Sequence, residues 1–90
     1  SDCEKLWSHL LKEDQELEVT ITFSLSAGQA KLVHIDPDGT ISTIIECTPE
    51  TEANDPVAKT ISFKKGKNRL KIVGYDCEDI DLKMTFMNPY

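Results

Sequence analysis

Apolar residues alternate with polar ones along much of the chain. The clearest run follows Leu17, where every second residue is apolar: Val19, Ile21, Phe23 and Leu25. Successive side chains of a strand point to opposite faces, so this pattern predicts a strand with one buried face. The apolar run at residues 30–36 predicts a second strand of unassigned facing, and weaker alternation predicts four more, over residues 40–47, 57–63, 70–74 and 80–86.

Turn signals separate these runs. Asp36-Pro37-Asp38-Gly39-Thr40 has Pro where a type I turn fixes φ and Gly at the left-handed position after it, which predicts a hairpin loop with a bulge. Segments 26–29 and 64–68 also read as turns, and no helical crossover lies between the strands. Short strands about ten residues apart favour an all-β fold, a small antiparallel, jelly-roll-like sandwich of about six to eight strands.

The first residues follow a different period. Leu6, Trp7, Leu10 and Leu11 recur at i, i+1, i+4 and i+5 among charged residues, which predicts a short amphipathic helix over residues 2–14. We therefore expect residues 1–15 to form an N-terminal helix, packed on the domain or left from a stalk, and residues 17–90 to form the sandwich. The apolar stripe of this helix is a candidate interaction face for a partner or for self-association.

Size and charge narrow the function. Ninety residues make one domain. Ten basic residues against sixteen acidic ones give a formal net charge of −6, which repels phosphate backbones, so we expect no nucleic-acid partner. No apolar run is long enough for a membrane span or a signal peptide, and the chain begins with Ser1, so we expect it to be processed or part of a longer protein.

The candidate catalytic residues form no recognisable constellation. His9 and His34 lie outside any nucleophile motif, and we expect both to be structural and the protein not to be an enzyme. The three cysteines, Cys3, Cys47 and Cys77, have no CxxC spacing, which makes a zinc site improbable. An odd number allows at most one internal pair, and whether Cys47 pairs with Cys77 stays open.

Acidic side chains crowd the segment Tyr75-Asp-Cys-Glu-Asp-Ile-Asp81. Asp81 belongs to the outward face of the last strand, which leaves Asp76, Glu78 and Asp79 as oxygen ligands in one turn. We expect no cofactor, with calcium at these three carboxylates as the alternative. An enzyme that uses Asp76, Asp79 and Asp81 with a divalent ion in hydrolysis is a third-ranked hypothesis.

Two other stretches are candidate binding sites. Residues 48–56 form the longest connection without a period, and such loops carry function more often than strands do, so Glu52, Asn54 and Asp55 are candidate ligand-binding residues. Half of the basic residues lie between Lys64 and Lys71. The preferred interpretation is a solvated hairpin, and the alternative is a contact for an acidic partner or glycan.

Residues 61–86 carry a family resemblance. Gly66, Asn68, Leu70 and Ile72, followed by the alternating strand Ile80, Leu82 and Met84, resemble the closing strands of carbohydrate-binding-module and galactose-binding-like jelly rolls. The resemblance implies the sandwich fold and sugar binding. The connecting loops lack the aromatic residues that contact sugar in such modules, and outside the predicted helix only Tyr75 and Tyr90 are candidates.

These observations favour a non-catalytic accessory or binding domain of a secreted or cell-surface bacterial protein, with a glycan or protein partner at the cell surface and an extracytoplasmic location. Binding to carbohydrate is the first reading. The alternative is a structural or protein-interaction module of unknown partner. Both rest on the absence of a catalytic constellation from the sequence.

Overall fold

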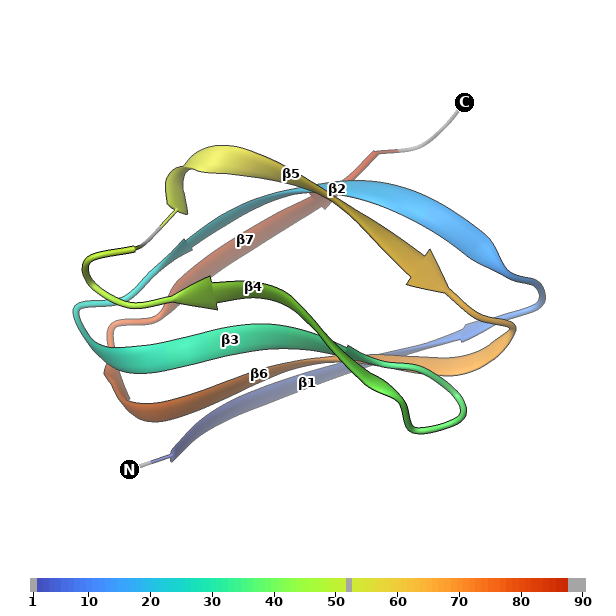
Figure 1. Cartoon of the computed structure of the whole chain (residues 1–90), viewed down its shortest axis with the longest axis horizontal. Helices are drawn as coiled ribbons and strands as arrows, with labels where there is room; N and C mark the ends of the chain where they lie inside the picture. Colours follow the sequence, from blue (N-terminus) through green and yellow to red (C-terminus); the bar gives the residue numbers. More distant parts are fainter. Residues whose placement is uncertain (1, 52, 88–90) are drawn as a thin grey trace.

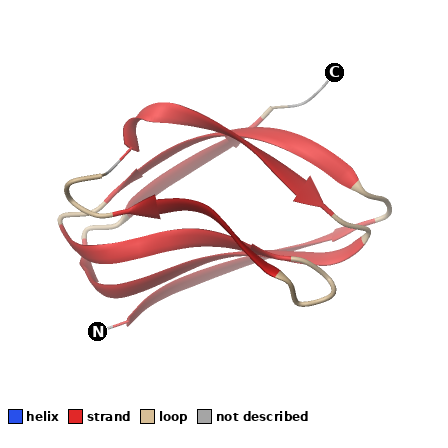
Figure 2. Cartoon of the chain, in the orientation of Figure 1, coloured by secondary structure: helices blue, strands red, loops and turns tan. Residues whose placement is uncertain are grey.

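The chain folds into two antiparallel β-sheets packed face to face (Figures 1 and 2). This computed structural model describes residues 2–51 and 53–87, and for residues 2–6, 53 and 54 only the course of the backbone. Its seven strands are β1 (Asp2–Leu11), β2 (Gln15–Ser24), β3 (Ala27–Ile35), β4 (Ile41–Cys47), β5 (Ala53–Phe63), β6 (Gly66–Glu78) and β7 (Asp81–Phe86).

The two sheets differ in width. The four-stranded sheet has the order β1-β6-β3-β4, and the three-stranded sheet has the order β5-β2-β7. Only β3 and β4 are consecutive neighbours, and each of the other five connections crosses from one sheet to the other. Strands β4 and β5 contact each other at one side of the sandwich, while β1 and β7 are the edge strands at the other side.

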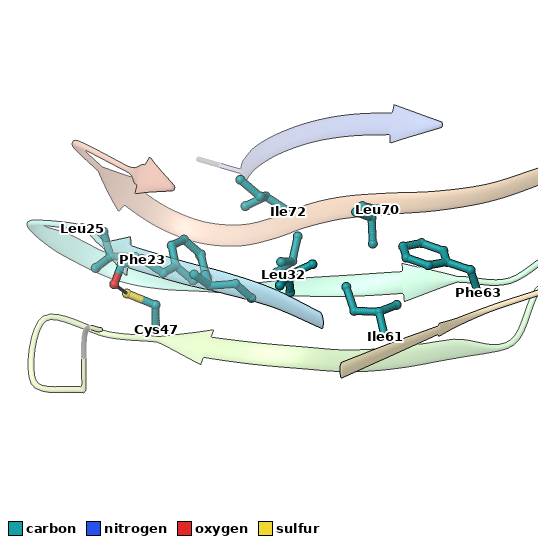
Figure 3. Close-up of a cluster of buried hydrophobic side chains, with 11 residues drawn as sticks. Phe23, Leu25, Leu32, Cys47, Ile61, Phe63, Leu70 and Ile72 are labelled. Atoms are coloured by element: carbon teal, nitrogen blue, oxygen red, sulfur yellow. Dashed lines mark hydrogen bonds between the residues drawn. The ribbon is translucent and has the colours of Figure 1, made fainter. Parts of the chain in front are cut away.

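The core lies between the sheets, where the alternation of β2 meets apolar residues of the opposite sheet (Figure 3). Val19, Ile21 and Phe23 are completely buried. The residues packed with them include Leu25, Ala30, Leu32, Cys47, Ile61, Phe63, Leu70 and Ile72. Because apolar area removed from water is the main favourable term in folding, these inward residues hold the two layers together.

One polar pair lies inside this core. His34 Nε2 donates a hydrogen bond of 2.9 Å to Oδ1 of Asn68, and the two residues are 6% and 1% exposed. The same Oδ1 accepts from Lys64 N, and the Asn68 amide donates to the carbonyl oxygens of Lys64 and Gly66. Asn68 therefore fixes the β5–β6 turn with three hydrogen bonds and contacts β3 with the fourth, which is the structural reason for the Gly-x-Asn spacing.

The predicted N-terminal helix is wrong. Residues 2–11 form strand β1, which pairs antiparallel with β6 from Asp2 opposite Tyr75 to Leu11 opposite Gly66. The described residues contain no helix at all, and so none that could span a membrane. The ladder with β6, distant in sequence, outweighs the helical spacing of four apolar residues, because propensity and periodicity are weak where long-range pairing decides.

The other predicted elements are largely confirmed. The strands expected after residue 17 are present, and the turn after β3 has the expected form, with Gly39 at φ 87° and Asp36 Oδ1 accepting from the amides of Asp38 and Thr40. Two bounds differ. Strand β5 begins at Ala53, inside the segment expected to be irregular, and β6 continues to Glu78.

Candidate functional site

The outward side of strand β6 carries a line of exposed or half-exposed side chains. Asn68, Leu70 and Ile72 point into the core, so the residues between them point away from it. We call the outward residues of this strand the β6 face: Lys67, Arg69, Lys71, Val73 and Tyr75. Three cations thus follow one another at a repeat of about 6.8 Å, with an aromatic ring at the end of the line.

The acidic residues of β1 lie at one end of this face, with Glu4 opposite Val73 and Asp2 opposite Tyr75, and not beside the first two cations. Arg69 lies between Ser8 of β1 and Ile35 of β3, and Lys67 lies opposite Leu10. Glu46 of β4 lies opposite Lys31 of β3, which is farther along the sheet. Among the described side chains, no carboxylate is therefore directly opposite Lys67 or Arg69, and the β6 face is cationic although the whole chain carries −6.

Apolar side chains form the floor beside the cations. Val33 lies opposite Lys71 and Ile35 opposite Arg69, and the two are 2% and 9% exposed although they are on the outward side of the sheet. Long aliphatic stems of Lys and Arg commonly cover apolar neighbours in this way while their charged ends stay in water. The charges of the face thus lie at its surface, beside apolar side chains that are buried.

The predicted ligand-binding residues do not form one cluster among the described side chains. Tyr75 is 61% exposed on the four-stranded sheet. Asp55 is exposed on β5, in the other sheet, and Asn54 is described only as backbone of the same strand. Glu52 lies outside the described residues. The sequence predicts a solvated hairpin at the cations of β6, and the spacing of two residues between Lys67, Arg69 and Lys71 is the signal that places them on a single face.

The acidic stretch after Tyr75 is a bulge followed by a turn. Asp76 and Asp79 have left-handed φ angles of 49° and 53°, and the β3–β6 register shifts between Ala27 and Gln29. Ser26 closes the turn, because its hydroxyl donates to Asp79 Oδ2 at 2.8 Å and its amide to the Glu78 carbonyl at 2.9 Å. Within the described part of the chain, no three acidic, histidine or cysteine side chains are grouped to hold a metal ion.

A cleft opens between the edge strands of the two sheets. It has a volume of about 470 Å³ and is lined from β1 by Trp7, Ser8, His9 and Leu11, and from β7 by Leu82, Met84 and Phe86. Gln15 and Leu17 of β2 and Phe63, Asn68 and Leu70 complete it. Trp7 and Leu11 of the predicted interaction stripe thus face this cleft, while Leu10 is 76% exposed on the opposite side of β1. The side chain of Leu6 lies outside the described part.

The cysteines are not paired between strands β4 and β6. Cys77 is disulfide-bonded, whereas Cys47 keeps its thiol, which is 1% exposed and donates to the Phe23 carbonyl oxygen at 3.4 Å. The question left open by the sequence is thereby answered against a Cys47–Cys77 bond. The remaining cysteine in the sequence, Cys3, lies on β1 opposite Gly74 in the ladder with β6.

Comparison with known proteins adds no relative. No family model matches the chain, and neither a curated protein nor a solved structure matches it. The resemblance of residues 61–86 to carbohydrate-binding jelly rolls therefore stays a prediction.

Proposed function

We propose that this protein is a non-catalytic binding module for acidic polysaccharides, with the β6 face as its binding surface. The observation that carries the proposal is the line Lys67, Arg69 and Lys71, which points away from the core of an otherwise acidic molecule. Sugar carboxylates and sulfates are the anions that such a polymer repeats along its length. Arg and Lys bind both groups through charge-assisted hydrogen bonds.

The shape of the surface suits an extended polymer. The three cations cover about 14 Å along one strand, so several anionic groups of one chain could be contacted together. Tyr75, at the end of the line, offers a flat ring with a polar tip, the kind of side chain that packs on a sugar ring. The net charge of −6 opposes the binding of any long polyanion, so contacts with an acidic polysaccharide would be confined to the local cationic face.

The disulfide supports an extracytoplasmic location. Disulfide bonds form and persist in oxidising compartments and are rare in reducing ones. A bonded Cys77 is thus consistent with a secreted or cell-surface protein, where acidic polysaccharides occur. We propose this location together with the function.

The test compares binding to a sulfated glycan, a polyuronate and a neutral glucan by calorimetry at low and at physiological salt. We expect binding to the two acidic polymers, weakened by salt because the contacts are between exposed charges. The double variant Lys67→Gln, Arg69→Gln should lose about tenfold in affinity, since each exposed charged contact contributes up to about 1 kcal/mol.

The control variant is Lys64→Gln, Lys65→Gln, which removes the same charge from the neighbouring turn. It should keep affinity to within about twofold if position on the β6 face matters rather than total charge. If both double variants lost affinity equally, the binding would depend on net charge and not on the position of the cations. A flat response to all three polymers would overturn the proposed function.

A further inference from the structure

The sandwich is one strand short at the side of the cleft. The four-stranded sheet ends with β1 and the three-stranded sheet ends with β7, and both strands line the cleft. Trp7 and Leu11 of β1 are half-buried and face this space. The inner side of β1 therefore meets an opening where the other sheet has no further strand among the described residues.

Strand β7 offers a free edge and an apolar inner side at the same place. It pairs with β2 from Asp81 opposite Ser24 to Phe86 opposite Val19, and in the described part of the chain no strand pairs with its other edge. Leu82 and Met84 are half-buried, and Phe86 is 45% exposed. An unpaired edge is a template for a further strand, and an apolar inner side favours covering it.

We propose that β7 accepts an extended segment of a partner protein as a fourth strand of the narrower sheet. The segment would have apolar side chains at alternate positions, and these would enter the cleft between β1 and β7. Backbone hydrogen bonds to the edge would supply affinity, and the cleft would select the side chains. This interaction is independent of the β6 face, which lies on the outward side of the other sheet.

The geometry of the cleft favours a strand over a compact ligand. Leu82, Met84 and Phe86 are successive inward positions of one strand, so the lining extends over about 14 Å with the same repeat as the side chains of an added strand. A strand in this position would lie opposite Trp7 and Leu11, and would give both sheets four strands.

Charge adds a second requirement on the partner. The outward residues of β2 and β7 include Glu16, Glu18 and Asp81 against Lys83, all of them exposed, and the chain as a whole carries −6. A segment whose outward residues are Lys or Arg would be attracted to this sheet, whereas an acidic segment would be repelled. The expected partner segment therefore alternates apolar and basic residues.

The test uses the whole chain and a ten-residue peptide of alternating Val and Lys. Trp7, the only tryptophan of the chain, lines the cleft and reports binding through its fluorescence. We expect saturable binding, and about tenfold weaker binding of a scrambled peptide of the same composition, because only strict alternation places all apolar side chains on one side. A third peptide, with N-methyl groups on alternate residues along one edge, should also bind about tenfold less tightly through loss of backbone donors.

Two protein variants locate the site. Met84→Ser removes an apolar side chain from the cleft and should weaken peptide binding, while Leu10→Ser alters the outward side of β1 and should not. Thermal unfolding shows whether Met84→Ser is folded, and the N-methylated peptide tests the proposal with the protein unchanged. Equal binding of the alternating, scrambled and N-methylated peptides would overturn it. So would a dimer of the chain formed through β7 that the peptide does not displace.

Discussion

Asn68 is a single residue on which both a turn and a core contact depend. Its side chain bonds with His34 Nε2, with the Lys64 amide and with the carbonyl oxygens of Lys64 and Gly66, at 1% exposure. His34 in turn packs edge-on against Phe63, with ring centroids 5.1 Å apart. Removing the amide would leave buried donors and acceptors without partners, and such groups cost about 1–3 kcal/mol each.

We therefore expect Asn68→Ala to lower the free energy of unfolding by about 2–4 kcal/mol, measured by urea denaturation. Lys67→Ala, the exposed neighbour on the same strand, is the control and should change it by less than about 0.5 kcal/mol. If both variants unfold at the wild-type urea concentration, the hydrogen-bonded role of Asn68 is wrong.

Gly28 is a residue that the backbone requires to be glycine. It has φ 84°, and a Cβ atom there would lie 2.3 Å from the Asp76 carbonyl oxygen and 2.5 Å from that of Tyr75. Gly39 has nearly the same φ, 87°, but a Cβ atom would meet nothing within 4 Å. The two glycines therefore separate the cost of a left-handed conformation from the cost of a clash.

We expect Gly39→Ala to destabilise the protein by about 1 kcal/mol, the usual cost of a left-handed residue with a Cβ atom. Gly28→Ala should cost at least about 2 kcal/mol more, because the acidic bulge of β6 must move away from β3. Thermal unfolding of the two variants measures the difference. If both variants lost the same stability, the bulge at Asp76 would move to accommodate the Cβ atom without a measurable cost in free energy.

The strands show how far the sequence predicts this fold at the level of elements. In β2 every second residue is apolar, so the inward face could be read directly, and Val19, Ile21 and Phe23 are indeed fully buried. In β1 the inward positions include Trp7, His9 and Leu11, and the outward ones include Leu10, so neither face is uniformly apolar. Its pairing with β6, from 55 residues away at Leu11 and Gly66 to 73 at Asp2 and Tyr75, decides its structure.

Of the two candidate sites, one can be predicted from local sequence and the other depends on long-range pairing. The β6 face rests on a period of two that is visible in the sequence, whereas the cleft depends on β1 and β7 being edges of different sheets, which no local pattern contains. The acidic stretch was predicted as a turn, yet Asp76 and Cys77 lie within β6, because the bulge opposite Gly28 extends the strand beyond Tyr75.

Because β1 is a strand, its adjacent residues Leu10 and Leu11 should differ in their contribution to stability. Leu10 and Leu11 are adjacent, but Leu10 is 76% exposed and Leu11 is half-buried against the cleft. Leu11→Ala should lower the free energy of unfolding by about 1–2 kcal/mol through lost apolar burial, and Leu10→Ala should change it by less than about 0.5 kcal/mol. In a helix both would belong to one stripe, so equal losses in urea denaturation would argue against the strand.

On the scale of the whole molecule, net charge conceals an uneven distribution. The outward side of the four-stranded sheet carries Lys67, Arg69 and Lys71, while that of the three-stranded sheet carries Glu16 and Glu18. The total of −6 predicts neither face. The two proposed partners, an acidic polysaccharide on the β6 face and a basic extended segment at the edge of β7, would bind different parts of one small sandwich and need not compete.

The disulfide of Cys77 lies beside the edge strand β1. Cys77 Sγ lies so close to Gly74 that a Cβ atom on that glycine would be 2.6 Å from it, and β1 runs alongside at this point, with Cys3 opposite Gly74. Because Cys47 keeps its thiol in the core, we expect peptide mapping without reductant to recover Cys77 joined to Cys3. Such a bond would tie the start of β1 to the end of β6.

Reduction should then lower stability, because the unfolded chain regains the conformational freedom that the closed loop denies it. We expect a reducing agent to decrease the free energy of unfolding by about 2–5 kcal/mol, measured by urea denaturation with and without reductant. Cys77→Ser is the matched control, since it should already have the lower stability and should not respond to reductant. Equal stability of the wild-type protein under both conditions would show that β1 is held by its ladder with β6 alone, and would remove the main physical support for an oxidising compartment.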